Sequence, residues 1–150
     1  MILGIDPGLD KIGWALISSN GDLFLSGICP ISEQESFITT FIRDTDCWQH
    51  ELSPWVTEKP QIIVALPEKL SFIAVGNGTG NQETMNLLKR LGVRTVIVDE
   101  KETTLEAREL YWNFHRLSWW QRYLPRIMRF PHRPLDDLAA LIIARRSLLL

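Results

Sequence analysis

The hydrophobic residues of this chain fall into two kinds of run. Short apolar runs bounded by glycine, proline or polar residues predict buried strands, and apolar residues at helical spacing predict amphipathic helices. The runs that predict strands are residues 2–5, 12–18, 23–28, 62–66, 72–75 and 95–98. The segments that predict helices are residues 32–52, 83–91, 104–114 and 135–150.

The order of these elements predicts the fold class. Asn20-Gly21 is a strong hairpin signal, so residues 1–28 predict a three-stranded antiparallel meander. Strands and helices alternate after that, which predicts a mixed sheet with helices against its faces. The chain has no internal repeat, linker or low-complexity stretch, so we expect a single α/β domain over residues 1–150.

Acidic residues stand where predicted strands end or a predicted helix begins. Asp6 follows the first strand, Asp99 and Glu100 follow the last, and Asp136 and Asp137 open the last helix. In an open α/β sheet, active sites gather beyond the carboxyl ends of the strands. Carboxylates that converge there repel one another unless a cation neutralises them, and Mg²⁺ or Mn²⁺ prefers such oxygen ligands. The alternative for each residue is turn or helix-cap chemistry, which commonly uses aspartate.

Four segments resemble motifs of one protein family. Residues 6–15 resemble the first motif of the YqgF/RuvX family, and residues 99–107 resemble its Asp-Glu-Arg…Thr-Thr…Ala motif. Residues 136–143 are similar to its last motif, an Asp followed by two small residues. Residues 74–80 are closer to the glycine-rich strand end of the YqgF-like domain in the transcription factor Tex. The resemblances occur in family order and cover most of the chain.

The resemblance implies a ribonuclease-H-like fold, with a mixed five-stranded sheet in which parallel strands continue the meander and helices cover both faces. It also implies a metal-dependent endonuclease that processes pre-16S rRNA ends or resolves Holliday junctions by two-metal phosphodiester hydrolysis. Asp6, Glu100 and Asp136 would be the catalytic acids and the ligands of Mg²⁺ or Mn²⁺, with Asp137 as the alternative third acid. If Glu100 pointed away from Asp6, the chain would instead resemble a catalytically inactive nucleic-acid-binding module.

Several residues near the acids are candidates for supporting roles. Gly8 lacks a Cβ and lets a sugar-phosphate backbone approach, and Lys11, Asn77 and Thr79 offer donors to phosphate. The alternatives are a solvated hairpin lysine and a plain glycine turn. His132 is a candidate for positioning a water or a metal ligand, although a lone histidine usually does neither.

Residues 110–135 contain no acidic residue but are rich in arginine and aromatic residues. Arginine side chains bind phosphates through paired hydrogen bonds, and aromatic rings stack on unpaired bases. We therefore expect the arginines to contact nucleic acid. For the aromatic side chains we favour burial along one side of a helix, because their apolar area is large. The arginines are Arg116, Arg122, Arg126, Arg129 and Arg133, and the aromatic residues are Tyr111, Trp112, Phe114, Trp119, Trp120, Tyr123 and Phe130.

Composition and charge change this picture little. Hydrophobic residues make up 45% and charged residues 23%, which excludes a disordered chain, a collagen-like fibre and a disulfide scaffold. The net charge of −2 sums over segregated acidic and basic segments, so it does not exclude a nucleic-acid partner. Two isolated cysteines, an N-terminus without a basic leader and no long apolar run predict a cytoplasmic protein. The sequence allows either an rRNA precursor or branched DNA as the partner. It also allows either a monomer or a homodimer.

Overall fold

The computed structural model describes residues 1–43, 52–58, 69–78, 80–125 and 128–150. Its strands are β1 (Ile2–Pro7), β2 (Lys11–Ile17), β3 (Leu23–Pro30), β4 (Val56–Glu58), β5 (Phe72–Gly76) and β6 (Thr95–Val98). Its α-helices are α1 (Gln34–Arg43), α3 (Asn81–Arg90), α4 (Thr103–Phe114) and α5 (Asp136–Ser147). Short 3₁₀ turns occur at η1 (Ile31–Glu33), η2 (Ser53–Trp55) and η3 (Gln121–Tyr123).

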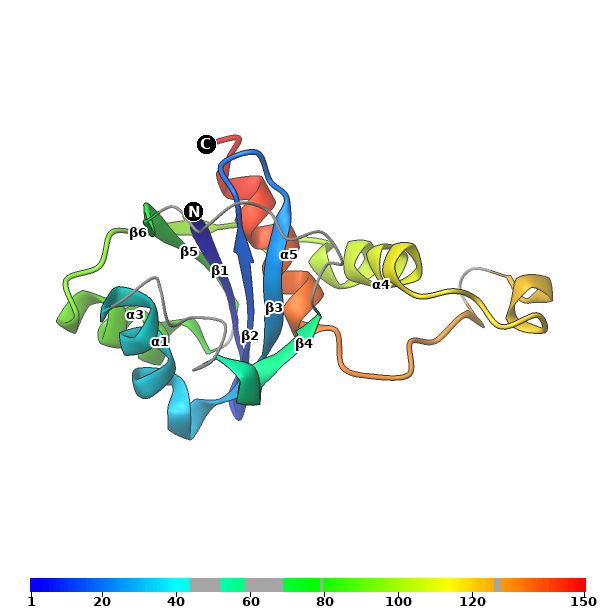
Figure 1. Ribbon diagram of the computed structural model, residues 1–150, viewed down its shortest axis with the longest axis horizontal. Coiled ribbons are helices and arrows are strands. Elements are labelled where there is room, and N and C mark those ends of the chain that lie inside the picture. Colours follow the sequence, from blue (N-terminus) through cyan, green and yellow to red (C-terminus); the bar gives the residue numbers. More distant parts are fainter. Residues whose placement is uncertain (44–51, 59–68, 79, 126–127) are drawn as a thin grey trace.

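The strands form one mixed, open sheet in the order β4-β3-β2-β1-β5-β6 (Figure 1). Neighbouring strands from β4 to β1 are antiparallel, whereas β1, β5 and β6 are parallel. The predicted α/β class, with its meander and its parallel strands, is therefore confirmed. The predicted count of five strands is wrong, because the described part of the chain forms a sheet of six. β4 is a three-residue edge strand, too short to show a hydrophobic pattern, and the predicted strand at residues 62–66 lies outside the described residues.

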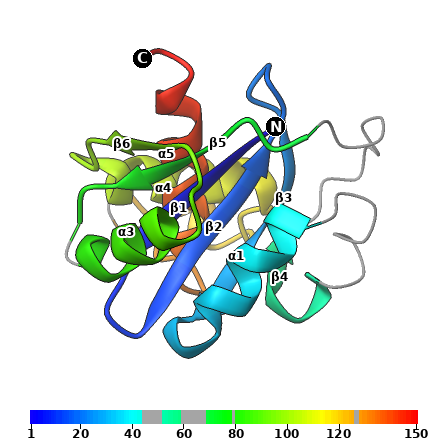
Figure 2. The same cartoon turned by 90° about the vertical axis from the view of Figure 1, so that its left-hand side faces the viewer.

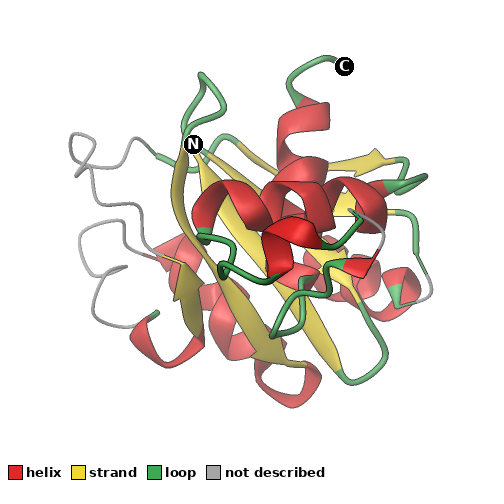
Figure 3. Cartoon of the chain, turned by 90° about the vertical axis from the view of Figure 1, so that its right-hand side faces the viewer, coloured by secondary structure: helices red, strands yellow, loops and turns green. Residues whose placement is uncertain are grey.

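The alternation of side chains along each strand decides which helices cover which face. Leu3 and Ile5 of β1 pack in an apolar core with α1 and α3. Ile2, from the opposite face of the same strand, packs in a second core with α4 and α5. Figures 2 and 3 show these two pairs of helices on opposite sides of the sheet. The predicted arrangement of helices on both faces is thus confirmed.

Helix α5 lies unusually close to β1 and β2 because the strands present glycine to it. A Cβ at Gly4 would collide with the carbonyl oxygen of Ala140, and a Cβ at Gly13 would collide with the carbonyl oxygen of Asp136. Gly13 is the cross-strand partner of Asp6 in the β1–β2 pairing. This close packing holds the first turn of α5 directly over the end of β1.

The helix boundaries differ from the predicted ones in two places. Helices α3 and α4 agree with the predictions to within two residues, but α5 ends at Ser147 rather than at Leu150. The predicted helix over residues 32–52 is confirmed only for its first half, because η1 precedes α1 and Leu52 lies in a turn. Residues 44–51 of that prediction lie outside the described residues.

Residues 115–134, which connect α4 to α5, extend away from the sheet (Figure 1). We call this segment the arm; residues 126 and 127 within it lie outside the described residues. Trp119, Trp120 and Tyr123 of the arm are exposed, so their predicted burial along a helix is wrong. Neither apolar core includes a described residue of the arm, and without a core to pack on, these rings face solvent.

Two observations bear on the predicted cellular environment. Among the described residues, no helix combines the length and the apolar character that crossing a membrane requires. Cys29 is buried, and this burial, together with the charge of Glu33, raises the pKa of its thiol to about 12. Cys29 therefore acts as an apolar filler in the core, as predicted, while Cys47 lies outside the described residues.

Candidate active site at the carboxyl ends of the strands

Three of the predicted acids meet at one edge of the sheet. Because β1, β5 and β6 are parallel, their carboxyl ends lie together. Asp6 lies near the end of β1, and Glu100 follows β6. Asp6 shares a face of β1 with Gly4, the face that α5 covers, so it lies towards Asp136 in the first turn of that helix. The fold thus brings together acids from three separate segments of the sequence.

The pKa of Asp6 reflects both its burial and the charged residues around it. Burial, followed by the negative charges of Glu100 and Asp136, raises the pKa of Asp6 from an ordinary 3.8 to about 7, and the positive charge of Lys11 opposes this rise. Burial is the larger cause, and the two neighbouring carboxylates add to it. Asp6 is therefore the centre of a negatively charged site in which added positive charge is favourable.

Glu100 lies in a space that two glycines leave open. A Cβ on Gly76 or on Gly78 would collide with its carboxylate. Burial raises the pKa of Glu100, the Gly78 backbone hydrogen bond lowers it, and the charge of Asp99 raises it. Its Oε1 atom is buried and has no hydrogen-bond partner. An unpartnered carboxylate oxygen is costly to bury, so it marks Glu100 as an acceptor open to a cation or a donor.

Asn77 supports Glu100 rather than projecting freely towards a ligand. Its side-chain Oδ1 accepts a hydrogen bond from the Glu100 backbone N–H at 3.1 Å. Its Nδ2 donates to Asp99 Oδ1 at 3.4 Å, and its own backbone N–H donates to the Val98 carbonyl at 3.1 Å. The predicted phosphate donor therefore braces the loop that carries Glu100.

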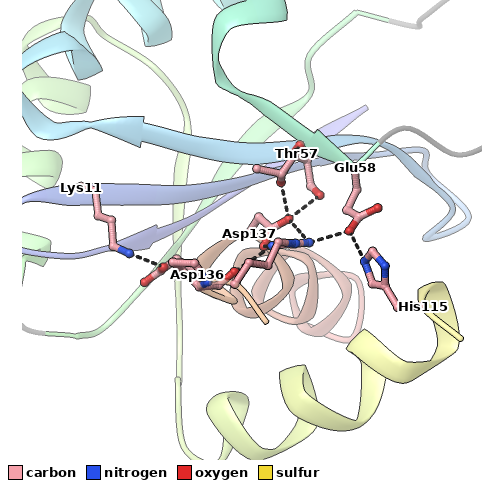
Figure 4. Close-up of polar contacts among 9 residues, drawn as sticks. Lys11, Thr57, Glu58, His115, Asp136 and Asp137 are labelled. Atoms are coloured by element: carbon pink, nitrogen blue, oxygen red, sulfur yellow. Dashed lines mark hydrogen bonds and ion pairs between the residues drawn. The ribbon is translucent and has the colours of Figure 1, made fainter. Parts of the chain in front are cut away.

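Asp136 and Asp137 take different roles because they point in different directions from the first turn of α5 (Figure 4). Asp136 Oδ2 forms an ion pair with Lys11 Nζ at 2.8 Å, and about a third of its side chain is exposed. Lys11 was a predicted phosphate contact, and in the structure it neutralises Asp136 instead. The geometry favours Asp136 over Asp137 as the third acid, since Asp136 is the one whose charge acts on Asp6.

Asp137 is fully buried and is held by hydrogen bonds from three directions (Figure 4). Its Oδ2 accepts bonds from Ser26 Oγ at 3.1 Å and from Thr57 Oγ1 at 2.6 Å. The Arg133 guanidinium binds both carboxylate oxygens, at 2.7 and 3.1 Å. Asp137 therefore anchors the start of α5 to β3 and β4, which fixes the position of its neighbour Asp136.

Glu58 of β4 joins this anchor to the arm, and no pattern in the sequence predicts its role. Its Oε1 accepts a hydrogen bond from Arg133 at 2.6 Å and lies 2.6 Å from Nε2 of His115. Arg133 is thus bound by Glu58 and Asp137, and its side chain is 22% exposed. Its predicted contact with nucleic acid would have to compete with these two ion pairs.

The other predicted supporting residues lie elsewhere. The Gly8 backbone N–H donates to the Lys11 carbonyl at 3.1 Å in the turn between β1 and β2. His132 is exposed in the arm, where it contacts Gln121 and Trp112, and none of its described contacts is with the three acids. Thr79 and Arg126 lie outside the described residues. Arg116 and Arg122 are exposed on the arm, and Arg129 is partly buried there.

The carboxylates of the three acids are suitable ligands for a hard divalent cation, but they are not arranged around a common point. Among the described residues, no group of three or more histidine, cysteine, aspartate or glutamate side chains is gathered closely enough to hold a metal ion. Asp136 is paired with Lys11, and Glu100 lies against Gly78. The donors are carboxylates, the type that Mg²⁺ and Mn²⁺ prefer, and one of them has an unpartnered buried oxygen.

A comparison with models of protein families finds no match for this chain. Comparison with curated proteins also finds no significant match. The interpretation of the acidic site therefore rests on its geometry and on the motifs in the sequence.

Asp6→Asn is expected to stabilise the protein at neutral pH in the absence of metal. Because the pKa of Asp6 is raised to about 7, the folded protein keeps a proton that the unfolded chain loses above about pH 4, so stability falls as the pH rises through this window. Asparagine carries no charge and avoids this loss. We expect the variant to have a higher free energy of unfolding by roughly 2 kcal/mol above pH 7, with the difference shrinking towards zero near pH 4.

Urea unfolding in EDTA across this pH range measures the difference. The matched control is Asp10→Asn, which removes an exposed carboxylate from the turn between β1 and β2 and is expected to leave stability nearly unchanged. A difference between Asp6→Asn and the natural protein that does not vary with pH would contradict the electrostatic origin.

Proposed function

We propose that this chain is a metal-dependent endonuclease of the ribonuclease-H-like type, which hydrolyses phosphodiester bonds in structured nucleic acid. The observation that carries the proposal is the meeting of Asp6, Glu100 and Asp136: burial, followed by the charges of Glu100 and Asp136, raises the pKa of Asp6 to about 7. These three residues come from the three segments that resemble YqgF/RuvX motifs. The antiparallel meander continued by parallel strands, with helices on both faces, is also the arrangement expected of a ribonuclease-H-like fold; β4 would be an addition at its edge.

Asp6, Glu100 and Asp136 would hold Mg²⁺ or Mn²⁺. When bound, the metal would lower the pKa of an attacking water and stabilise the leaving oxygen. Lys11 neutralises Asp136 when no cation is present, and its ammonium is free to pair with a phosphate once Asp136 binds elsewhere. Gly76 and Gly78 keep the space that the Glu100 carboxylate needs. Asp137 holds the first turn of α5 in place through Ser26, Thr57 and Arg133.

A nucleic-acid-binding module without catalytic activity is the second candidate function. The ion pair between Lys11 and Asp136 favours it, because an internal cation already balances one of the three acids. The two candidates share the exposed arginines Arg116 and Arg122 as contacts for phosphate. They differ in whether any divalent metal produces cleavage.

The test is cleavage by the full chain of two labelled substrates, a four-way DNA junction and an RNA duplex with single-stranded ends that mimics an rRNA precursor. We expect cleavage of at least one substrate with Mg²⁺ or Mn²⁺ and none with EDTA. We also expect binding in EDTA that weakens steeply with salt, since phosphate contacts release counterions. Salt-dependent binding without cleavage in either metal would support the binding module, and a lack of binding would contradict both candidates.

A further inference from the structure

The arm exposes an unusual amount of aromatic surface. The side chains of Trp119, Tyr123 and Phe130 are 76%, 85% and 65% exposed, and Trp120 is half exposed. Large aromatic side chains are normally buried, because each carries a large apolar area. A group of them on one projecting segment therefore indicates a binding surface.

The base of the arm is fixed to the body of the protein. The residues at its two ends, His115 and Arg133, both contact Oε1 of Glu58, each at 2.6 Å. The His115 ring also stacks on Tyr111 of α4 with centroids 4.2 Å apart, and the Arg133 guanidinium lies 5.7 Å from the centroid of the same Tyr111 ring. Glu58 thereby holds both ends of the arm against β4.

Polar contacts also order the arm beyond its base. The Gln121 side chain is buried; its Oε1 accepts a hydrogen bond from the Ser118 N–H at 2.9 Å, and its Nε2 lies 3.3 Å from His132. The Arg129 guanidinium donates to the carbonyls of Leu124 and Arg122, at 3.1 and 3.2 Å. The arm is therefore built on polar contacts, and its aromatic rings are left available for a ligand.

The positive charge of the arm indicates what kind of ligand would bind to it. Residues 110–135 contain five arginines and no acidic residue, and Arg116 and Arg122 are exposed within a few residues of the rings in the sequence. A positively charged segment with exposed aromatic rings suits a polyanion that carries flat rings of its own. Unpaired nucleotides have both properties, since bases stack on aromatic side chains and phosphates pair with arginine. A paired duplex hides its base faces and offers only the phosphates.

We propose that the arm binds unpaired nucleotides, with bases stacked on Trp119, Trp120 and Tyr123 and phosphates held by Arg116 and Arg122. This inference rests on the proposed nucleic-acid function and specifies its substrate as a nucleic acid with a single-stranded segment beside the cleaved bond. The arm leads directly into the acidic site, because Arg133 is followed three residues later by Asp136. The same ion pairs that hold the arm also hold Asp137, so the arm and the acids keep a fixed relation to each other.

The experiment measures binding of the full chain in EDTA, so that no cleavage interferes. Fluorescence anisotropy is recorded with labelled oligonucleotides of about 20 nucleotides: single-stranded DNA, single-stranded RNA and a blunt DNA duplex. In the triple variant Trp119→Ala/Trp120→Ala/Tyr123→Ala, we expect affinity for at least one single strand to fall about tenfold or more, with duplex affinity changed less than about threefold. The single-stranded DNA and RNA distinguish the two sources of unpaired bases.

Two control variants separate stacking from general effects. Trp119→Phe/Trp120→Phe/Tyr123→Phe keeps aromatic faces and is expected to retain most of the single-strand affinity. Leu105→Ala/Leu149→Ala removes exposed apolar side chains outside the arm and is expected to bind as the natural protein does. Since all these side chains are exposed or partly exposed, circular dichroism is expected to show unchanged folding.

Each remaining outcome overturns the proposal in a recognisable way. If the natural chain binds nucleic acid and the triple alanine variant binds single strands equally well, the arm inference is wrong while the proposed function stands. If the natural chain binds no nucleic acid, the proposed function fails with it. If the triple variant changes only the oligomeric state in analytical ultracentrifugation, the aromatic surface is an interface between copies of the chain.

Discussion

Asp6→Asn is expected to lower metal-dependent cleavage by roughly a thousandfold while the protein stays folded. Burial and the charges of both Glu100 and Asp136 raise the pKa of Asp6. Removing its charge takes away a ligand oxygen of full negative charge and leaves a side chain of nearly the same shape. The measurement is the single-turnover cleavage rate with saturating Mg²⁺, on whichever substrate the natural chain cleaves.

The matched control is again Asp10→Asn, whose exposed carboxylate lies four residues further along the chain, in the turn that follows β1. It is expected to cleave at nearly the natural rate. Asp6→Asn is also expected to be more stable than the natural protein at neutral pH, so a loss of cleavage could not be explained by unfolding. Unchanged cleavage by Asp6→Asn would show that the acidic site does not perform the reaction.

Asp137→Ala is expected to lower the free energy of unfolding by about 3 kcal/mol, although Asp137 takes no part in the proposed chemistry. The substitution leaves Arg133 half paired and removes the acceptor of Ser26 and Thr57. Breaking a buried ion pair commonly costs about 3–5 kcal/mol, and the lower value applies because Arg133 keeps Glu58 as a partner. Urea unfolding at neutral pH measures the change.

The neighbouring variant Asp136→Ala is the control. Its carboxylate is about a third exposed, pairs with the partly exposed Lys11 and raises the pKa of Asp6, so we expect a change of less than about 1 kcal/mol. The two variants should also differ in function, since Asp136→Ala is expected to lose cleavage while remaining stable. Equal losses of stability in both variants would contradict the assignment of Asp137 as the anchor and Asp136 as the acid.

The positions of Asp6 and Glu100 were predictable because both residues stand at the ends of strands. A strand can be recognised in the sequence as a local apolar run, and the residue after it lies at the carboxyl end of that strand. Asp6 and Glu100 could therefore be placed near each other without a structure. The choice between Asp136 and Asp137 was not predictable, because both open the same helix and only the packing of α5 on Gly4 and Gly13 fixes its rotation.

The environment of the arginines and aromatic residues could not be predicted for a different reason. Arg133 is withdrawn from solvent by Glu58, which is 75 residues away in the sequence and lies on a strand too short to recognise. The exposure of Trp119 and Tyr123 depends on the path of the arm away from both cores. Hydrophobicity alone favours burial, and it carries no information on whether a core is within reach.

Local sequence patterns were enough to predict the α/β class, the antiparallel meander, the parallel strands and the gathering of acids at their carboxyl ends. These features follow from local hydrophobic patterns and from the geometry that any parallel sheet imposes. Long-range packing sets which aspartate acts on Asp6, which arginine is internal and which aromatic rings are exposed. Those outcomes depend on contacts between residues far apart in the chain, such as Thr57 and Asp137, and such contacts leave no local pattern.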